Sequence, residues 1–365
     1  MSRIISHVCK VFLPTNGGVQ RVVDEICQTT FDTHVSEVIS TARDKNTSTY
    51  SYAYAPLKLA RSYFDLLSTP VAPNVIRLIY RAIRRNDVCA IHYPYPIADI
   101  AVSFFSLFKK TTVVVHWHSN IYSQKKTERL IRPFTHIMLS KATKIVVSSP
   151  EMINNSKLLT SFRSKCVVIP YGTKKLPAPV KVDSIDADAY FISIGRHVEY
   201  KGFKYLIEAM RLNSHKLIML GDGPLYDTHR ALIDEYGLAD RVTLVREVSD
   251  SEKQEYLAKA LVLILPSIYP SEAFAIVQIE AMMLGKPVIN TQLASGVPWV
   301  ARDGLEAITV NPSDSTALNV AMDKIISDAR LREELAKNAY RRACDLFSKP
   351  VFQKNIDSLY RPLMQ

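Results

Sequence analysis

The sequence predicts an α/β protein with two domains, each a parallel sheet covered by helices on both faces. Short apolar segments that are typical of buried strands alternate along the chain with segments of helical periodicity. With 365 residues, the chain also exceeds the usual size of one domain. The alternation is interrupted over residues 170–188, where Pro177 and Pro179 stand among loosely patterned charges. We therefore expect a first domain over residues 1–170, followed by a linker into the second.

The first domain is predicted to begin with a strand over residues 3–12 and a helix over residues 19–28. Further apolar segments predict strands over residues 88–92, 111–118, 144–147 and 166–169. In open α/β sheets, ligands collect at the carboxyl ends of the strands. Side chains that directly follow these strands are therefore the first candidates for a site.

The second domain is predicted to repeat this pattern and to end in a long helix. Its strands are expected over residues 189–194, 216–220, 242–245, 261–265 and 287–290. Its helices are expected over residues 203–210, 225–236 and about 274–284, and the last helix of the chain over about residues 349–361.

Composition favours a cytoplasmic protein. Hydrophobic residues make up 47% of the chain, enough for large cores. No apolar run reaches the roughly 20 residues that span a bilayer, and the N-terminus shows no signal-peptide pattern. The five cysteines are scattered and lack metal-ligand spacing, so we expect small core residues in a reducing compartment.

The basic excess lies in the first domain. Residues 1–170 carry 22 Lys and Arg against 10 Asp and Glu, whereas the remainder carries 24 against 25. Signatures of nucleic-acid-binding folds are absent, so nucleic acid is not an expected partner. Residues 76–85 alternate apolar and basic residues at helical spacing, and residues 104–110 place Phe and Leu beside Lys109 and Lys110. We expect an anionic membrane surface as partner, although a core-packed helix with a solvated basic face also explains either stretch alone.

Two glutamates, Glu272 and Glu280, flank and enter the helix predicted over residues 274–284. Glu280 has apolar neighbours one turn away on both sides, so its carboxylate needs donors, either from a Lys or Arg or from the hydroxyls of a ligand. Glu272 lies in the loop that opens the helix, where free amides attract anions. Together the two carboxylates and the amides predict a site for a phosphorylated sugar.

This segment resembles the paired-glutamate signature of retaining glycosyltransferases with two Rossmann-like domains, the GT-B fold, in group 1 and family 4. The resemblance implies that the domains face each other across a cleft, that residues 171–348 bind the nucleotide sugar, and that a helix over residues 349–365 returns to the first domain. It also implies that Glu272 contacts the donor sugar, that Glu280 holds the ribose, and that the amides near Phe274, Ala275 and Ile276 face the sugar or diphosphate. The family usually has Gly where Ala275 stands, and a methyl there restricts the backbone.

Two cations follow the first strand of the second domain. Arg196 and Lys201 flank a short loop, so both could neutralise charge on one diphosphate, or both could be solvated surface cations. They match the Gly-Arg and Lys-Gly pair of the family, which implies the phosphate role. Asp186 and Asp188 mimic a metal-binding aspartate pair, but they precede a strand, and we expect a solvated loop. No metal and no cofactor are therefore expected.

Three further motifs contribute candidates. Gly17 and Gly18 form a turn between strand and helix that lets backbone approach a phosphate, and they match the family's glycine loop. Gly221 belongs to a second such turn, which is either an ordinary tight turn or the family's nucleotide-side loop. His116 and His118 share a strand face, but a third zinc ligand is missing. His118 matches a family histidine beside the donor sugar, and Lys125 and Lys126 follow it toward an acceptor phosphate.

We expect a metal-independent hexosyltransferase that acts with retention on a lipid-linked saccharide in bacterial O-antigen or capsule synthesis, peripheral on the cytoplasmic face of the inner membrane. The segments His-Trp-His-Ser-Asn and Pro-Ser-Glu-Ala-Phe are similar to those of enzymes of bacterial O-antigen and capsule assembly. A mannosyltransferase that uses GDP-mannose is the preferred interpretation. Two alternatives stay open: a nucleotide-sugar 2-epimerase of the same fold, which needs no acceptor, and a non-catalytic module that binds sugar nucleotide or polysaccharide, which does not hydrolyse the donor.

Overall fold

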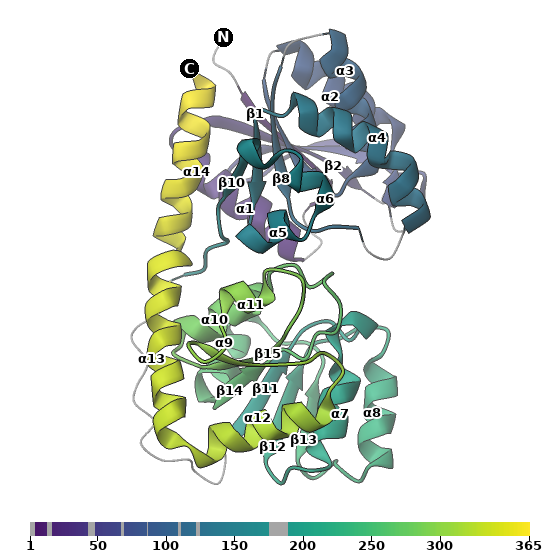
Figure 1. The fold of residues 1–365 in the computed structure, drawn as a ribbon. Coiled ribbons are helices and arrows are strands. Elements are labelled where there is room, and N and C mark those ends of the chain that lie inside the picture. Colours follow the sequence, from purple (N-terminus) through teal and green to yellow (C-terminus); the bar gives the residue numbers. More distant parts are fainter. Residues whose placement is uncertain are drawn as a thin grey trace. The chain divides into compact units, whose positions relative to one another are not determined.

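The computed structural model describes residues 4–12, 17–42, 48–66, 69–85, 87–108, 111–121, 125–174 and 189–365. The chain divides into two compact units (Figure 1). Unit 1 comprises Met1–Tyr171 together with Phe352–Gln365, and unit 2 comprises Gly172–Val351. The final helix thus begins in unit 2 and ends in unit 1.

Unit 1 contains an eight-stranded sheet in the order β10-β9-β8-β7-β1-β2-β4-β3, in which only β3 runs antiparallel to its neighbour. All six residues of β7 are buried, as expected for a strand covered on both faces. The strands are β1 (Ile4–Val11), β2 (Val35–Ala42), β3 (Ser48–Ser51), β4 (Pro56–Arg61), β7 (Val88–Tyr93), β8 (Thr112–Trp117), β9 (Lys144–Val147) and β10 (Cys166–Val168), with a separate hairpin of β5 (Phe64–Leu66) and β6 (Thr69–Val71).

The first two helices of unit 1 each bury one apolar stripe and leave a polar or mixed face exposed. In α2, for example, Val75, Ile79, Ala82 and Ile83 are buried, which is the spacing of one helix face. The helices are α1 (Gly18–Thr30), α2 (Pro73–Arg85), α3 (Pro96–Phe108), α4 (Lys125–Lys141), α5 (Pro150–Asn154) and α6 (Lys157–Thr160), followed by the 3-10 turn η1 (Arg163–Lys165).

The last helix, α14 (Lys349–Met364), completes unit 1. Phe352, Ile356 and Tyr360 are buried along one face of the helix. The Tyr360 hydroxyl lies 2.7 Å from Nε2 of His116 on β8, which ties the helix to the sheet. The predicted return of the C-terminal helix to the first domain is therefore confirmed.

Unit 2 contains a parallel six-stranded sheet in the order β13-β12-β11-β14-β15-β16. Its strands are β11 (Tyr190–Ile194), β12 (Lys216–Leu220), β13 (Val242–Val245), β14 (Val262–Ile264), β15 (Val288–Thr291) and β16 (Ala307–Val310). Its helices are η2 (Glu199–Lys201), α7 (Phe203–Met210), α8 (Tyr226–Glu235), α9 (Asp250–Lys259), α10 (Ile276–Met283), α11 (Val297–Val300), α12 (Ser315–Ser327) and α13 (Ala329–Leu346).

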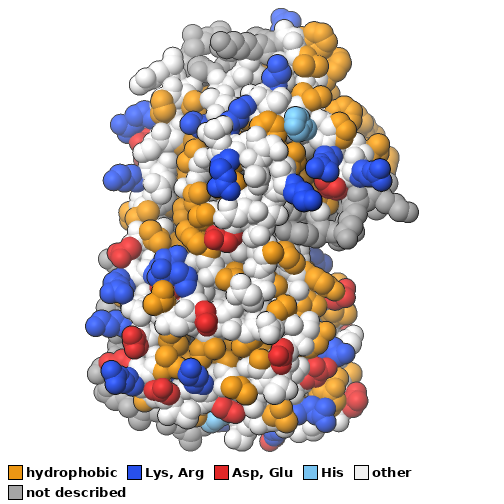
Figure 2. Space-filling view, in the orientation of Figure 1, with side chains coloured by type: hydrophobic (Ala, Val, Ile, Leu, Met, Phe, Trp, Pro, Cys, Tyr) orange, Lys and Arg blue, Asp and Glu red, His pale blue; other side chains and the backbone are white. Residues whose placement is uncertain are grey.

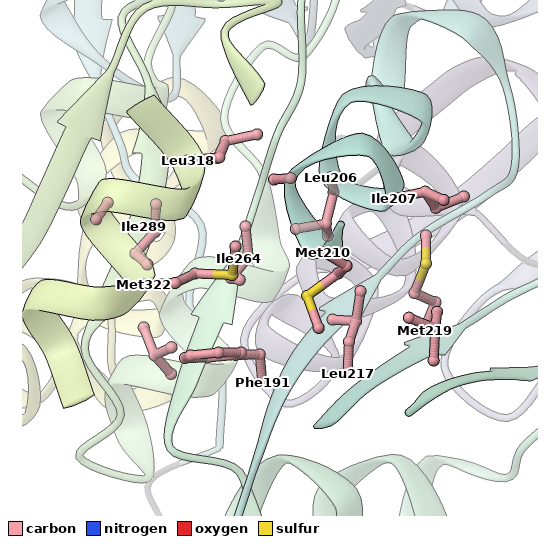
Figure 3. Packing of buried hydrophobic residues seen from close by; sticks show 14 of the residues in the cluster. Phe191, Leu206, Ile207, Met210, Leu217, Met219, Ile264, Ile289, Leu318 and Met322 are labelled. Carbon is pink, nitrogen blue, oxygen red and sulfur yellow. The ribbon is translucent and has the colours of Figure 1, made fainter. Parts of the chain in front are cut away.

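The main core of unit 2 lies between this sheet and helices α7 and α12 (Figure 3). Leu206 and Met210 of α7 meet Phe191 and Leu217 of the strands, and Met322 of α12 reaches the same layer. All five side chains are fully buried. This core fixes the carboxyl ends of β11 and β14, where the candidate site residues are found.

Most predicted elements occur within one or two residues of their expected bounds. Strands β9, β12 and β13 and helix α7 have the bounds that the sequence predicts. Helix α10 begins at Ile276, two residues later than predicted, because Ala275 takes a left-handed conformation. Strands β2, β4 and β16 and helices α12 and α13 were not predicted, and most of the predicted linker, residues 175–188, lies outside the described residues.

The five cysteines are unpaired, and Cys9, Cys27 and Cys89 are buried. Among the described residues, no helix combines the length and the apolar character that crossing a bilayer requires.

Candidate functional site

The candidate site of unit 2 is built at the point where its sheet changes direction. From β11 the chain moves outward to β12 and β13, then returns to place β14 on the other side of β11. In open α/β sheets, ligands bind at such a switch point, outside the carboxyl ends of the strands. The loops after β11 and β14 carry Arg196, Lys201 and Glu272, three of the predicted site residues.

The structure pairs Lys201 with Glu272. Lys201 Nζ lies 2.6 Å from Glu272 Oε2, and the Ser267 hydroxyl donates to the same oxygen at 2.9 Å. Both charged residues are 8% exposed. Burial alone would lower the pKa of Lys201, but attraction to Glu272 outweighs it and raises the pKa above its usual value. Lys201 is therefore held as an ammonium group, and its remaining N–H donors can serve a ligand.

Two glycines let the loops at this edge approach one another. Gly202 has a φ of 66°, and a Cβ there would lie 2.1 Å from the Pro266 carbonyl oxygen. Gly221, after β12, has a φ of 135°, and its Cβ would lie 2.0 Å from the carbonyl oxygen of Gly195. No larger residue fits at either position without moving backbone. Gly221 thus packs the β12 loop against the β11 loop that carries Arg196.

Arg196 differs from Lys201 in its surroundings. Its side chain is exposed, and the described residues give it no ion pair. The two predicted diphosphate cations therefore differ in their surroundings, since Lys201 is fixed by Glu272 and Arg196 is open to solvent. An exposed guanidinium can still bind a phosphate in bidentate fashion.

The start of α10 follows Glu272 by four residues and presents backbone amides. Phe274 is buried against Trp299 and Phe347, with ring centroids 6.4 and 6.0 Å away. Ala275 is the N-cap, with φ 60° and ψ 77°. The first helical amides, beginning with Ile276, have no partner within the helix. Such amides suit an anion, as the sequence predicted.

The left-handed Ala275 yields a test of opposite signs. A left-handed non-glycine residue costs about 1 kcal/mol, so Ala275→Gly is expected to raise the melting temperature of the protein slightly. The matched control is Ala281→Gly in the interior of α10, a buried position with ordinary helical geometry, where glycine costs about 0.5–1 kcal/mol plus a lost methyl contact. Thermal unfolding should show that the melting temperature shifts in opposite directions in the two variants. A lower melting temperature in both would show that Ala275 is not strained.

Glu280 is paired as well. Its Oε1 lies 2.9 Å from Lys253 Nζ on α9, and these side chains are only 19% and 13% exposed. The structure therefore shows the alternative that the sequence left open, a glutamate that pairs with a Lys or Arg. It does not exclude ribose binding, since a carboxylate accepts several hydrogen bonds.

The loop after β13 contributes another cation. Arg246 stacks on the Tyr226 ring at 4.1 Å and contacts Asp227 at 2.8 Å. Its neighbours Glu247 and Ser249 are also exposed. The structure makes this segment a loop with one fixed guanidinium.

In unit 1, the glycine turn lies at the start of α1. Gly17 is the N-cap, with extended backbone, and a Cβ at Gly18 would meet open space. The turn follows β1, and the sheet of unit 1 changes direction between β1 and β7. Residues 13–16 lie outside the described part, so the turn is seen only from Gly17 onward.

His118 follows β8 and is almost fully buried. Nε2 lies 2.9 Å from Nδ1 of His92, and Nδ1 lies 2.7 Å from the Tyr171 hydroxyl. Burial lowers the pKa of His118 to about 3. His116 lies on the same strand face as His118, as predicted, but its hydrogen-bond partner is the Tyr360 hydroxyl. Across the described residues, no group of three or more His, Cys, Asp or Glu is placed to hold a metal ion.

Some predicted residues cannot be placed. Asp186, Asp188, Lys109 and Lys110 lie outside the described residues, and Lys125 and Lys126 begin α4 with side chains that are not described. Sequence reasoning in turn missed three partners, Ser267, Lys253 and His92. Lys253 lies one turn into α9, after the capping box of Ser249 and Glu252, and only the fold brings it to Glu280.

Two family models together cover most of the chain. Residues 16–174 match the model described as Glycosyltransferase Family 4, and residues 178–342 match the model described as Glycosyl transferases group 1. The chain belongs to the group 1 glycosyltransferases. It is a nucleotide-sugar-dependent enzyme, and the predicted membership of this family is confirmed.

Full-length relatives agree with this family. The glycosyltransferase is 25% identical to O-antigen chain mannosyltransferase C of Escherichia coli, over 99% of both chains. It is 28% identical to D-rhamnosyltransferase WbpZ of Pseudomonas aeruginosa, over 94% of this chain and 92% of that protein.

Solved structures show the same fold. Sucrose-phosphate synthase from Thermosynechococcus elongatus matches with a TM-score of 0.82 and 21% identity over 99% of both chains. Anabaena Alr3699/HepE in complex with UDP matches with a TM-score of 0.79 and 17% identity over 99% of this chain and 100% of that one. The glycosyltransferase therefore has the GT-B fold.

Proposed function

We propose that the glycosyltransferase moves a hexosyl group, with mannose from GDP-mannose as the preferred donor, to a lipid-linked saccharide in bacterial surface polysaccharide synthesis. The pairing of Lys201 with Glu272 at the switch point of unit 2 carries this proposal. It places an ammonium group, a carboxylate and helix amides together, which suits a diphosphate joined to a sugar. The names of the mannosyl- and rhamnosyltransferase relatives support the sugar class and the acceptor class.

The chemistry that we propose is transfer with retention and without a catalytic metal. Charge that develops on the departing diphosphate is met by Lys201 and Arg196, so cations of the chain take the part that a divalent ion plays elsewhere. Glu272 orients Lys201 and accepts hydrogen bonds from donor-sugar hydroxyls. The acceptor hydroxyl attacks the anomeric carbon from the face from which the nucleoside diphosphate leaves. The new glycosidic bond replaces the bond to the diphosphate, and the hydroxyl proton passes to the departing diphosphate.

A donor screen tests the proposal. The purified protein is incubated with GDP-mannose, UDP-glucose, UDP-GlcNAc, UDP-galactose or a D-rhamnosyl nucleotide, with and without a polyprenyl-linked saccharide. We expect the largest thermal shift and acceptor-dependent product with GDP-mannose, an α-linked product by NMR, and activity in EDTA. Product formed without an acceptor would indicate epimerisation, and binding without turnover would indicate a non-catalytic module. Preference for another nucleotide sugar would contradict GDP-mannose as the donor.

We also propose that the enzyme works at the cytoplasmic face of the inner membrane and that α2 and α3 form its membrane-facing surface. Along α3, Ile100, Phe104, Leu107 and Phe108 are 40, 57, 58 and 76% exposed, at the spacing of one helix face. Apolar and basic side chains lie side by side on unit 1 in Figure 2. Exposed aromatic bulk beside basic charge is typical of proteins that rest on acidic lipid.

The basic part of this surface lies on α2. Arg77, Arg81 and Arg84 are exposed at one-turn spacing. Tyr80 lies between them, and its ring packs on Phe105 of α3 at 4.9 Å. The rings of α2 and α3 are therefore in contact, and the basic stripe borders the apolar one.

Arg85, which the sequence grouped with these residues, has another role. Its Nη2 lies 2.7 Å from Asp87 Oδ2, and it also contacts Glu37. Both carboxylates are buried, so reversing the charge at Arg85 would place three carboxylates together and destabilise unit 1. Arg85 is therefore not a useful position for testing membrane binding.

Charge reversal of Arg77, Arg81 and Arg84 to Glu is expected to weaken binding to vesicles with acidic lipid by several kcal/mol, at about 1 kcal/mol per cation plus new repulsion. The double variant Phe104→Ser with Phe108→Ser should weaken binding in high salt as well as in low salt. Vesicle sedimentation measures both effects. The matched control reverses Arg330, Lys337 and Arg341 of α13, and equal losses in control and test would make the effect one of net charge.

A further inference from the structure

A chain of buried histidines crosses the sheet of unit 1. His7 on β1, His92 at the end of β7 and His118 after β8 come from neighbouring strands and are 0, 2 and 6% exposed. His7 Nδ1 lies 3.2 Å from His92 Nε2, and His92 Nδ1 lies 2.9 Å from His118 Nε2. His118 Nδ1 completes the chain at the Tyr171 hydroxyl, 2.7 Å away. Each nitrogen pair shares one proton, so the direction of the first bond sets the direction of the others.

The Tyr171 end is compatible with either direction, because a tyrosine hydroxyl can donate a hydrogen bond to His118 Nδ1 or accept one from it.

The His7 end fixes the direction of the chain. His7 Nε2 is buried and has no hydrogen-bond partner among the residues that the structure describes. A buried N–H without an acceptor is rarer in proteins than a buried lone pair without a donor. The His7 proton is therefore on Nδ1 and is donated to His92, whose own Nδ1 proton is donated to His118.

Burial keeps these rings uncharged. It lowers the pKa of His7 and of His118 to about 3, and burial with the neighbouring histidines lowers that of His92 well below its usual value. Among the described residues, the other titratable groups that face the chain are His116, stacked on His92 at 4.8 Å, and Tyr360, whose ring centroid is 6.1 Å from that of His7. Neither supplies a negative charge at neutral pH that would favour an imidazolium.

We propose that His7 and His92 are positioning residues that hold His118 as a neutral ring with its proton on Nδ1. Any ligand contact of this ring competes with Tyr171 or His92. A ligand oxygen that takes the place of the Tyr171 hydroxyl meets an N–H donor, so His118 polarises such an oxygen and does not remove a proton from it. The role of His118 in transfer rests on the proposed function, whereas the tautomer is a property of the fold.

Nitrogen NMR of protein labelled with ¹⁵N-histidine tests the tautomer directly, because protonated and bare ring nitrogens have distinct shifts. The chain has nine histidines, and single His→Gln variants assign the signals. We expect His7, His92 and His118 to show one Nδ1–H tautomer each, without change between about pH 5.5 and 8, because their lowered pKa values lie below this range. An Nε2–H signal from His92 or His118, or titration of either within this range, would overturn the proposal.

Variants at His92 separate positioning from a merely structural role. His92→Leu removes the donor to His118 and should populate both His118 tautomers, whereas His92→Asn places an amide N–H near the former Nδ1 and should restore the single one. The matched control is His116→Leu, which removes a buried histidine hydrogen bond from the same sheet but lies off the chain. The control should leave the His118 signal as it is in the wild type, and an equal disturbance by both leucine variants would refute the chain as the cause.

Steady-state kinetics of the same variants test whether the His118 tautomer matters for transfer. Since misplacing a contact group slows the reaction more than it weakens binding, His92→Leu should lower kcat about 10-fold with little change in donor KM. His92→Asn and His116→Leu should stay near the wild-type rate. An unchanged kcat in His92→Leu beside a disturbed tautomer would refute positioning, and absence of transfer by the wild type with every donor would refute the proposed function alone.

Discussion

Replacing Lys201 with alanine is expected to lower turnover by about 10²–10³ and to destabilise unit 2 at the same time. The catalytic loss arises because Lys201 is assigned to the diphosphate, where charge grows as the glycosidic bond breaks. The stability loss arises because Glu272 would remain buried with Ser267 as its recorded donor. Removing one partner of a buried ion pair costs about 3–5 kcal/mol, which thermal unfolding detects easily.

Arg196→Ala should show only the first of these effects. Its exposed guanidinium has no ion pair with the described residues to break, so the melting temperature should stay near that of the wild type while turnover falls by a similar factor. For both variants the loss should appear mainly in kcat, because the contact strengthens in the transition state.

Lys204→Ala is the matched control for this pair of variants. Lys204 lies three residues beyond Lys201 on α7, is largely exposed, and forms a 3.7 Å pair with Glu208. Both its turnover and its melting temperature should stay close to those of the wild type, since exposed pairs contribute little. Near-normal turnover in the Lys201 and Arg196 variants, or activity lost to chelation and restored by manganese, would rule out cation catalysis by the chain.

The sequence predicts the two-domain α/β fold because its strongest signals are local. Buried parallel strands are short continuous apolar runs, so β9, β12 and β13 are found at their true bounds. Strand β2 is missed because Ser36, Glu37 and Ser40 interrupt its apolar pattern. These polar residues are nevertheless buried, and Glu37 is paired with Lys58 and Arg85 from other elements.

Pairings between distant residues could not be derived from local pattern. Lys201 and Glu272 are each legible from a motif, but their contact depends on β14 lying beside β11, which only the strand order determines. The histidine chain is hidden for the same reason, since His7 and His92 stand singly on strands far apart in sequence. For Arg85, local pattern gave the wrong environment. Helical spacing grouped it with surface cations, but in the fold it binds buried carboxylates.

The second large effect is expected from Glu280. If Glu280 accepts hydrogen bonds from the ribose, Glu280→Gln should weaken the free nucleoside diphosphate and the intact donor alike, by about 1.5–3 kcal/mol each. Both ligands contain the ribose, so both lose the same interaction. Calorimetric titration with the nucleoside diphosphate and with the nucleotide sugar gives the two losses separately.

Glu272→Gln should give a different result. This carboxylate is assigned to the donor sugar, so the intact nucleotide sugar should lose affinity while the nucleoside diphosphate keeps most of its own. The variant also loses the charge that holds Lys201. A small loss of affinity for the nucleoside diphosphate is therefore expected, but it should be smaller than the loss for the nucleotide sugar. Equal losses for both ligands in both variants would contradict the two roles.

Lys253 is the residue that holds Glu280 in the structure. At 2.9 Å from Glu280 Oε1 and largely buried, its ammonium group fixes the position of the carboxylate before the nucleotide arrives. Lys253→Ala is therefore expected to reproduce part of the Glu280→Gln loss, again for both ligands. The control is Lys259→Ala, at an exposed position near the end of the same helix. Should Lys253→Ala instead bind the nucleotide more tightly than the wild type, the pair would compete with the ribose for Glu280, and its positioning role would be wrong.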